Sequence, residues 1–244
     1  HLVIGDPHCT PKASNERFLW AGRVAADYKV SHVICMGDFC SMDSLSSYDR
    51  AKKSFEGRRY QKDMDHSHEA LSLFNKGLGK HKPKKIMLHG NHEDRIDRFV
   101  DENPELDGTL KISDLKFKQY GWQEVPYRSM KVVDGIHYAH HFPSGIMGSA
   151  ISGENIGRTL LTKHKVSATV GHSHLLDYAI STLPNGKKIH GLSAGCYLSH
   201  SEHFARDTQH MWWNGLILKR EVKDGNYNIE TIDIKTIRRE YGRR

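Results

Sequence analysis

Residues 88–96 read LHGNHEDRI, and several polar side chains in this stretch follow directly on an apolar run. The run KIML at 85–88 predicts a buried strand, and Gly90 after it allows the backbone to turn sharply. Asparagine, histidine and glutamate follow at 91–93, at the carboxyl end of the predicted strand, where α/β sheets bind ligands. A Gly-Asn-His sequence alone is more often a turn than a site. The ends of the other predicted strands therefore decide whether this one is functional.

Four other predicted strands also end in oxygen or imidazole ligands, three of them beside a glycine. These strand ends supply Asp6 and His8, Asp38, His140 and His141, and His172 and His174. Turn propensity can account for each of them separately, but it does not account for all five strand ends together. We therefore predict that these Asp, Asn and His side chains converge at one edge of the fold.

The apolar pattern changes between the two halves of the chain. In the first half, predicted strands alternate with predicted helices, which favours parallel pairing. The strands lie near 2–5, 32–36 and 85–88, and the helices near 15–28 and 60–78. In the second half, the dipeptides Asp134-Gly135, Asn185-Gly186 and Asp224-Gly225 predict hairpins, and one helix near 154–164 interrupts them. We predict an α/β fold of two packed β-sheets flanked by helices, the first mostly parallel and the second mixed parallel/antiparallel, in one domain over residues 1–244.

The composition is that of an ordinary soluble globular protein, because 37% of the 244 residues are hydrophobic and 27% are charged. No apolar run approaches the ~20 residues that a membrane span needs, so we expect no membrane partner. The four cysteines form no CxxC pair, which suits a reducing compartment and favours a cytoplasmic location. The net charge of +7 favours polyanionic partners, and the 18 histidines favour metal binding or acid–base chemistry.

The motifs at the strand ends resemble those of the calcineurin-like metallophosphoesterase superfamily. In chain order they are Asp6-x-His8, Gly37-Asp38, Gly90-Asn91-His92-Glu93, His140 and Gly171-His172-x-His174. The resemblance spans residues 1 to about 175 and implies a metallophosphoesterase-type sandwich of two sheets. It also implies a hydrolase that cleaves phosphoester bonds with two divalent metal ions.

The resemblance assigns the metal ligands residue by residue. It implies that Asp6, His8 and His174 hold one ion, that Asn91, His140 and His172 hold the other, and that Asp38 bridges both. A carboxylate shared between two cations suits that position because it screens their mutual repulsion. Mixed histidine and carboxylate ligands favour Mn²⁺ first and Fe or Zn²⁺ next, whereas Ca²⁺ and Mg²⁺ prefer oxygen ligands alone.

The resemblance also implies catalytic roles beside the metal ligands. His92 is similar to the family's catalytic histidine, which stabilises the phosphoryl charge and protonates the leaving oxygen. Glu93 is expected to orient His92 through a hydrogen bond. Arg95 could donate two hydrogen bonds to a phosphoryl oxygen, although a solvated arginine in the first turn of a helix explains it equally well. At the fourth strand end the ligand is open between His140 and His141, and the alternation of side chains along the strand favours His140.

The substrate is less constrained than the metal centre. Ser/Thr protein phosphatases of the superfamily carry an Asp-Arg pair shortly after the Gly-Asp motif. This chain reads GDFCSMDSLSSYDR at 37–50 and has serine and methionine where that pair would fall. Repair nucleases of the superfamily usually carry Asp at the position of Glu93. Basic segments at 52–62, 81–85 and 235–244 favour DNA or RNA as a partner, although solvated helix faces and a charged tail explain each one separately.

From these features we expect hydrolysis of phosphodiester bonds, in nucleic acid or nucleotides, by a hydroxide that bridges the two ions. The alternative is a phosphomonoesterase that acts on small phosphorylated molecules or on phosphoproteins. A third reading, a binding scaffold of the same fold without metal, requires lost ligands, and every ligand position is filled in this sequence.

Overall fold

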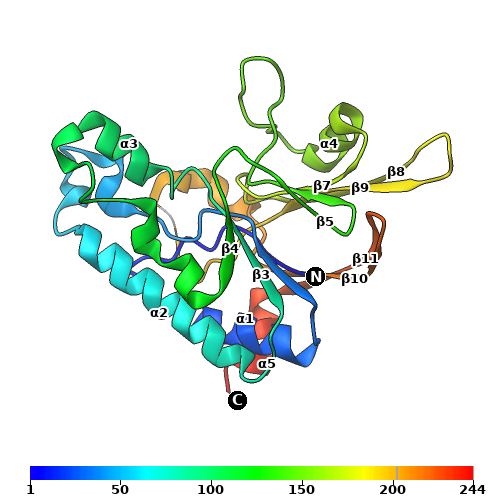
Figure 1. Cartoon of the computed structure of the whole chain (residues 1–244), viewed down its shortest axis with the longest axis horizontal. Coiled ribbons are helices and arrows are strands. Elements are labelled where there is room, and N and C mark those ends of the chain that lie inside the picture. The colour runs from blue at the N-terminus through cyan, green and yellow to red at the C-terminus, as the bar shows by residue number, and fades with distance from the viewer. Residues whose placement is uncertain (202, 244) are drawn as a thin grey trace.

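The computed structural model describes residues 1–201 and 203–243. Two β-sheets pack face to face, and helices cover their outer faces (Figure 1). The first sheet has the strand order β11 (Asn226–Asp233), β10 (Gly215–Lys223), β1 (Leu2–Ile4), β2 (His32–Cys35), β3 (Lys84–Leu88) and β4 (Trp122–Val125). The second has the order β5 (Lys131–Val133), β6 (Ile136–Tyr138), β7 (Ser167–Val170), β9 (Lys188–Ala194) and β8 (Leu176–Thr182). The helices are α1 (Glu16–Asp27), α2 (Tyr60–Leu78), α3 (Arg95–Glu102), α4 (Ile156–His164) and α5 (Ile234–Tyr241).

The strand directions confirm the predicted α/β sandwich. In the first sheet β1, β2, β3 and β4 are parallel, and β10 and β11 are antiparallel additions at one side. In the second sheet β6, β7 and β9 are parallel, while the outer strands β5 and β8 are antiparallel to their neighbours. The first sheet is therefore mostly parallel and the second is mixed, as the hairpin dipeptides and the helical periods predict.

The C-terminal hairpin of β10 and β11 belongs to the first sheet, so the two sheets do not correspond to the two halves of the chain. Although it follows the second sheet in sequence, β10 pairs with β1 in the first sheet, where Leu2 lies opposite Leu218 and Ile4 lies opposite Leu216. All four of these side chains are buried. Without β10, the short and fully apolar strand β1 would be an exposed sheet edge, which proteins normally cover. The hairpin therefore completes the sheet that carries the first ligand motif.

Three apolar layers hold the sheets and helices together. Side chains alternate between the two faces of a strand, so that in β2 Val33 packs under the helices while Ile34 packs between the sheets. Helices α1, α2 and α5 contribute to the layer outside the first sheet, and α4 packs on β7, β8 and β9 outside the second. The inner strands are buried on both faces, which explains their continuous apolar runs.

The strand directions also fix the place of the site. Because β1, β2 and β3 are parallel, the residues that follow them leave the first sheet at the same edge. Strands β6 and β7 of the second sheet are parallel to each other, and the residues after them reach the same region. Within the part of the chain that the structure describes, no helix combines the length and the apolarity needed to cross a bilayer.

Candidate metal centre

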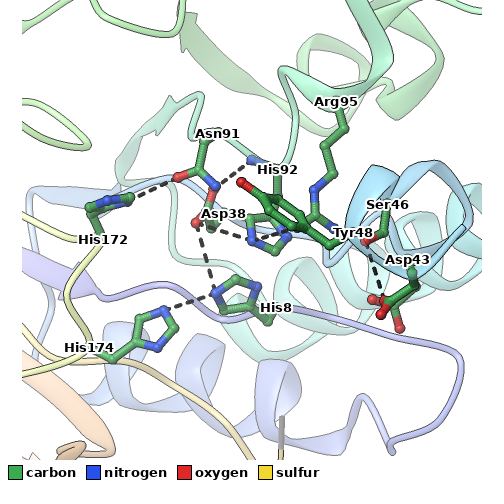
Figure 2. A pocket seen from close by; sticks show the side chains of 11 residues that line it. His8, Asp38, Asp43, Ser46, Tyr48, Asn91, His92, Arg95, His172 and His174 are labelled. Atoms are coloured by element: carbon green, nitrogen blue, oxygen red, sulfur yellow. Dashed lines mark hydrogen bonds and ion pairs between the residues drawn. The ribbon is translucent and has the colours of Figure 1, made fainter. Parts of the chain in front are cut away.

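The side chains that follow these five strands meet in one cluster of histidines, aspartates and an asparagine (Figure 2). The cluster forms one side of a pocket of about 340 Å³. The lining includes five of the predicted site residues from the first three strand ends and two from the last, namely His8, Asp38, Asn91, His92, Arg95, His172 and His174. The other three predicted site residues, Asp6, Glu93 and His140, are buried and are not part of the lining. The sequence motifs therefore converge in space.

The first group of candidate ligands comes from the ends of β1 and β7. The imidazole nitrogen Nε2 of His8 lies 3.0 Å from Nε2 of His174, which in turn lies 3.3 Å from Oδ2 of Asp6. Asp6 is fully buried, and its Oδ2 also accepts a hydrogen bond of 2.5 Å from the backbone nitrogen of His172. Asp6, His8 and His174 thus direct their ligand atoms at a shared point.

The second group comes from the ends of β3, β6 and β7. Oδ1 of Asn91, Nε2 of His140 and Nδ1 of His172 form a triangle with sides of 3.0, 3.1 and 3.2 Å. Asp38 lies between the two groups, because its Oδ2 is 3.5 Å from Nε2 of His140 and 3.9 Å from Nε2 of His8. The position of Asp38 matches that expected for a carboxylate shared by two ions.

The structure distinguishes His140 from His141 by position. His140 is buried and has both ring nitrogens inside the cluster, whereas Nδ1 of His141 has no hydrogen-bond partner among the described residues and its ring packs against Tyr127 and His172. The backbone leaves β6 at Tyr138, and the next residues carry only His140 inward. The geometry therefore favours His140, and the role of this residue as a ligand stays a prediction.

Two of the motif glycines are required by the close approach of aspartates. A Cβ atom on Gly90 would lie 2.1 Å from Oδ1 of Asp38, and a Cβ atom on Gly171 would lie 2.2 Å from Oδ1 of Asp6. Both distances are far inside van der Waals contact, so any other residue would displace a candidate ligand. The glycines that precede Asn91 and His172 thus make room for carboxylates from other strands.

Four candidate ligands have a left-handed backbone, which is uncommon for residues other than glycine. The φ angles are +41° at His8, +46° at Asp38, +67° at His172 and +61° at His174. Each such residue costs of order 1 kcal/mol or more, and strain of this kind gathers at functional sites. All four residues lie in the turns after β1, β2 and β7, so the fold holds the cluster at the expense of local backbone energy.

The protonation of the cluster suits metal binding. Burial lowers the pKa of His8 well below its usual range, and burial together with the neighbouring His140 lowers the pKa of His172 to about 4. Both imidazoles are therefore neutral at pH 7, which is the form that binds metals. His140 differs from these two imidazoles. Burial lowers its pKa, but the carboxylates of Asp38 and Asp6 have the larger combined effect, so its pKa is raised above the usual value. A metal cation bound between Asp6 and Asp38 would stabilise the two carboxylates in place of a proton on His140.

Hydrogen bonding supplies an independent test of whether these residues fit metal ions. Oδ1 of Asp6 is buried and accepts no hydrogen bond from any residue that the structure describes. Nδ1 of His140 donates to the backbone oxygen of Met36 at 2.9 Å, which leaves the lone pair of Nε2 facing the second group. A carboxylate oxygen without a donor and an imidazole fixed through its other nitrogen are both typical of metal ligands. The residues present therefore fit two divalent ions.

His92 lies in the cluster but has different partners. Its Nδ1 donates to the backbone oxygen of Ser41 at 2.8 Å, and its Nε2 lies 3.8 Å from Oδ2 of Asp38. Burial lowers its pKa well below the usual range, and the guanidinium of Arg95 lowers it further. Arg95 is half-buried; it donates to the oxygen of Ser41 at 2.8 Å and lies 3.3 Å from Nε2 of His92. Both side chains line the pocket beside the two ligand groups.

Glu93 does not make the hydrogen bond expected from the sequence. Instead of contacting the ring of His92, its carboxylate accepts hydrogen bonds from backbone nitrogens of Gly90 at 2.7 Å, Asp38 at 3.0 Å and Cys40 at 3.2 Å. The reason is direction: Glu93 points into the protein, under the turn after β2, while His92 points into the pocket. Glu93 therefore joins two ligand-bearing turns.

The structure adds residues to the site that the motifs did not indicate. The segment after β2 forms the other side of the pocket through Asp43, Ser46, Tyr48 and Asp49. Short 3₁₀ turns shape this segment, and its sequence carries no periodic signal that could have placed it. Proximity to the Gly37-Asp38 motif was the only available indication.

The three basic segments are distributed unevenly around the site. The segment 52–62 adjoins the pocket, because Arg58 and Lys52 both contact Asp49 in its wall, at 2.8 and 3.6 Å. The segment 81–85 leads into the beginning of β3, about 15 Å along the strand from its site end. Most of the third segment belongs to α5, on the outer helical side of the first sheet (Figure 1). Among the described residues of these segments, those of the first alone are beside the pocket.

Comparison with known proteins agrees with this geometry. The sequence profile of calcineurin-like phosphoesterases matches residues 2–176 of this chain. The chain therefore belongs to the calcineurin-like phosphoesterase family, whose members are metal-dependent hydrolases of phosphoester bonds. No curated protein matches the sequence. One crystal structure aligns with 94% of this chain and 97% of its own, at 11% sequence identity and a TM-score of 0.45, a likeness too low to bear on the function.

Proposed function

We propose that this chain hydrolyses phosphodiester bonds in nucleotides or nucleic acid with a hydroxide held between two divalent ions. The observation that supports this proposal most directly is the position of one carboxylate. Oδ2 of Asp38 lies within 3.5–3.9 Å of imidazole nitrogens from the first group (His8), the second group (His140) and the candidate acid His92. A single oxygen thus connects both ligand groups to the residue that would carry the proton.

Asp6, His8 and His174 would hold one ion, Asn91, His140 and His172 the other, and Asp38 would contact both. When bound, two such ions lower the pKa of a water molecule between them and neutralise charge on the phosphoryl oxygens. The histidine-rich ligand set favours Mn²⁺, with Fe and Zn²⁺ as the next candidates.

The side chains around the ions have separate tasks in this proposal. The hydrogen bond from Nδ1 of His92 to Ser41 fixes the ring with Nε2 toward the pocket, and a second proton taken up on Nε2 would pass to the leaving oxygen. Arg95 lies within reach of the same position and would orient a phosphoryl oxygen. Glu93 keeps the turns of Asp38 and Asn91 together without touching substrate.

The charge of the pocket wall favours a diester over a monoester. A diester carries one negative charge near neutral pH, whereas a monoester carries almost two. Arg95 lies beside the ligand groups, and the opposite wall carries the carboxylates of Asp43 and Asp49, which Lys12 and Arg58 pair at 2.9 and 2.8 Å. The wall therefore offers little net positive charge for the second charge of a monoester.

The alternative is a phosphomonoesterase, and one observation supports it. Arg95 Nη2 lies 3.3 Å from Nε2 of His92, so this guanidinium could bind the terminal oxygens of a monoester at the point where the leaving group departs. The net charge of +7 and the basic segment at 52–62 favour a nucleotide or nucleic acid as the substrate in either case. The pocket is of a size that suits one nucleotide unit or a strand end.

Paired chromogenic substrates test the proposal. With Mn²⁺ present, hydrolysis of bis-p-nitrophenyl phosphate should exceed that of p-nitrophenyl phosphate, and exhaustive chelation should abolish both. Metal analysis should find about two ions per chain. If single-stranded nucleic acid is the substrate, its binding should weaken with salt by ~0.7 in log–log slope for each phosphate contacted. A preference for the monoester, without salt-sensitive binding of any polynucleotide, would replace the diesterase by the phosphatase.

A further inference from the structure

One aromatic side chain in the pocket has no role in holding metal or moving protons. Tyr48 lines the pocket opposite the ligand groups, and the residue is 77% exposed to solvent. It makes no hydrogen bond, ion pair or ring contact with any residue that the structure describes. Large aromatic side chains are usually buried in part, so a freely exposed one at a pocket rim needs a separate explanation.

The segment that carries Tyr48 is firmly held. Nη1 of Arg58 donates to the backbone oxygen of Asp43 at 2.9 Å and to Oδ2 of Asp49 at 2.8 Å, so that it spans the segment on both sides of Tyr48. Oδ2 of Asp63 in α2 accepts hydrogen bonds from the backbone nitrogen and the hydroxyl of Ser44, at 3.0 and 2.6 Å. These bonds fix the wall while leaving the tyrosine outside it.

The position of Tyr48 relates it to the ligand groups. In Figure 2 its ring lies in front of His92, between Arg95 and Asp43, and Tyr48, His92 and Asp38 line the same pocket. The ester substituent of a phosphoryl group at the ions would therefore share this pocket with the tyrosine ring. The ring provides a flat apolar surface of the kind on which a nucleobase stacks.

We propose that Tyr48 is a stacking platform for the base of the nucleotide whose phosphate is bound at the metal centre. The proposal rests on the proposed function and narrows its substrate class to phosphoesters that carry a planar base next to the reacting phosphate. Base–aromatic stacking contributes about 5- to 150-fold in affinity per base, and it tolerates any base because each has a π-face. Tyr48 therefore selects for nucleotides without selecting among sequences.

Two matched ligands test the platform by equilibrium binding to the Mn²⁺-loaded protein. Adenosine 5′-monophosphate and ribose 5-phosphate present the same phosphate, and only the first has a base. The wild type should bind the nucleotide at least about 5-fold more tightly than the sugar phosphate. Tyr48→Leu should remove this difference while leaving the affinity for ribose 5-phosphate unchanged, and Tyr48→Phe should retain it because the ring is kept.

A kinetic comparison addresses the ester itself. Thymidine 5′-(p-nitrophenyl phosphate) and methyl p-nitrophenyl phosphate share one leaving group, and only the first carries a nucleoside with its base, so Tyr48→Leu should raise KM for the first alone. Tyr28→Leu, which removes a partly exposed tyrosine outside this pocket, is the control and should change neither substrate.

The possible outcomes separate the two proposals. If the wild type cleaves neither diester, the diesterase is wrong, and the binding comparison still decides the role of Tyr48. The stacking platform would be overturned, even in an active diesterase, if the wild type bound adenosine 5′-monophosphate and ribose 5-phosphate with equal affinity. It would also be overturned if Tyr48→Leu reduced the affinity for both ligands by the same factor.

Discussion

Oε2 of Glu93 accepts a hydrogen bond of 3.0 Å from the backbone nitrogen of Asp38, the carboxylate that lies between the two ligand groups. The same oxygen accepts from Gly90 at 2.7 Å, and Oε1 accepts from Cys40 at 3.2 Å. One buried side chain therefore fixes the turn after β2 to the turn after β3. Asp38 has a left-handed backbone with φ of +46°, and the bond from Glu93 helps to hold that conformation.

This relationship predicts that Glu93→Gln weakens both the fold and the metal site. A glutamine has one acceptor oxygen, so at least one of the three buried amides loses its partner at a cost of about 1–3 kcal/mol. Thermal unfolding should begin about 2–12 °C lower, and metal affinity should fall about 10- to 100-fold. The exposed Glu56 provides the control, because Glu56→Gln should alter neither quantity. Unchanged metal affinity in Glu93→Gln would show that the turns hold their positions without it.

The adjacent histidines provide a second prediction. His140→Ala should remove about one ion per chain, because Nε2 of His140 is 3.1 Å from Oδ1 of Asn91 and 3.5 Å from Oδ2 of Asp38. His141→Ala is a matched change one residue further along and should leave the metal content near two. Metal analysis after gel filtration measures both. Loss of metal from the His141 variant alone would reverse the assignment.

The sequence predicts the sheets and the ligand cluster because both depend on local patterns. Apolar runs mark the buried strands, and parallel strands necessarily bring their carboxyl ends to one edge. Less regular elements escape this reasoning. β4 consists of only four residues, WQEV, in which half of the side chains are polar, and α5 is an eight-residue helix with a strongly basic sequence. Tertiary contacts decide such short elements more than their own propensity does.

The hydrogen-bond partners of Glu93 differ from the expected one for a related physical reason. Sequence adjacency suggests that Glu93 contacts His92, but neighbouring residues at the start of a helix point in different directions. The partners of Glu93 at Asp38 and Cys40 are 55 and 53 positions away, and no periodic pattern connects them. Tyr48 escaped notice similarly, since its exposure and its place at the pocket depend on how Arg58 folds the segment back.

A buried lysine between the sheets predicts a pH dependence of stability. Lys219 is 2% exposed, its Nζ lies 4.4 and 4.6 Å from the ring centres of Tyr138 and Tyr227, and burial lowers its pKa well below the usual range. The unfolded chain protonates this lysine below pH ~10.4, but the folded chain does so only at lower pH. The contribution of Lys219 to stability therefore falls as pH drops from about 10 toward the folded pKa.

Lys219→Met, which keeps an unbranched side chain one heavy atom shorter, should remove this dependence. The urea midpoint of unfolding should be higher for the variant than for the wild type at pH 7, and this difference between the two midpoints should be smaller at pH 9.5. Each tenfold difference in proton affinity between the folded and unfolded chain corresponds to about 1.4 kcal/mol. Lys223→Met, an exposed change on the same strand, should give the same difference at both pH values. An advantage of Lys219→Met that does not vary with pH would rule out titration of the lysine as its cause.

The final prediction separates proton transfer from metal binding at the centre. His92→Ala should keep both ions, because Nδ1 of His92 is committed to Ser41 and the proposed ligand set, with three side chains for each ion and Asp38 for both, does not include it. On an ester with an alkyl leaving group, the rate should fall roughly 10²- to 10⁴-fold, the usual contribution of a general acid. Asp38→Asn should instead lose metal as well as rate, and asparagine tolerates the left-handed backbone at this position, so the turn itself should persist.

The dependence on the leaving group makes this comparison decisive. A p-nitrophenolate departs readily without a proton, so His92→Ala should lose little on that ester and far more on one with an alkyl leaving group, which requires protonation as the bond breaks. Asp38→Asn should lose activity on both esters in equal proportion, because the ions act on the phosphoryl group whichever group leaves. Equal losses on both esters in His92→Ala, with two ions still bound, would assign His92 to stabilisation of phosphoryl charge and leave the proton to another donor.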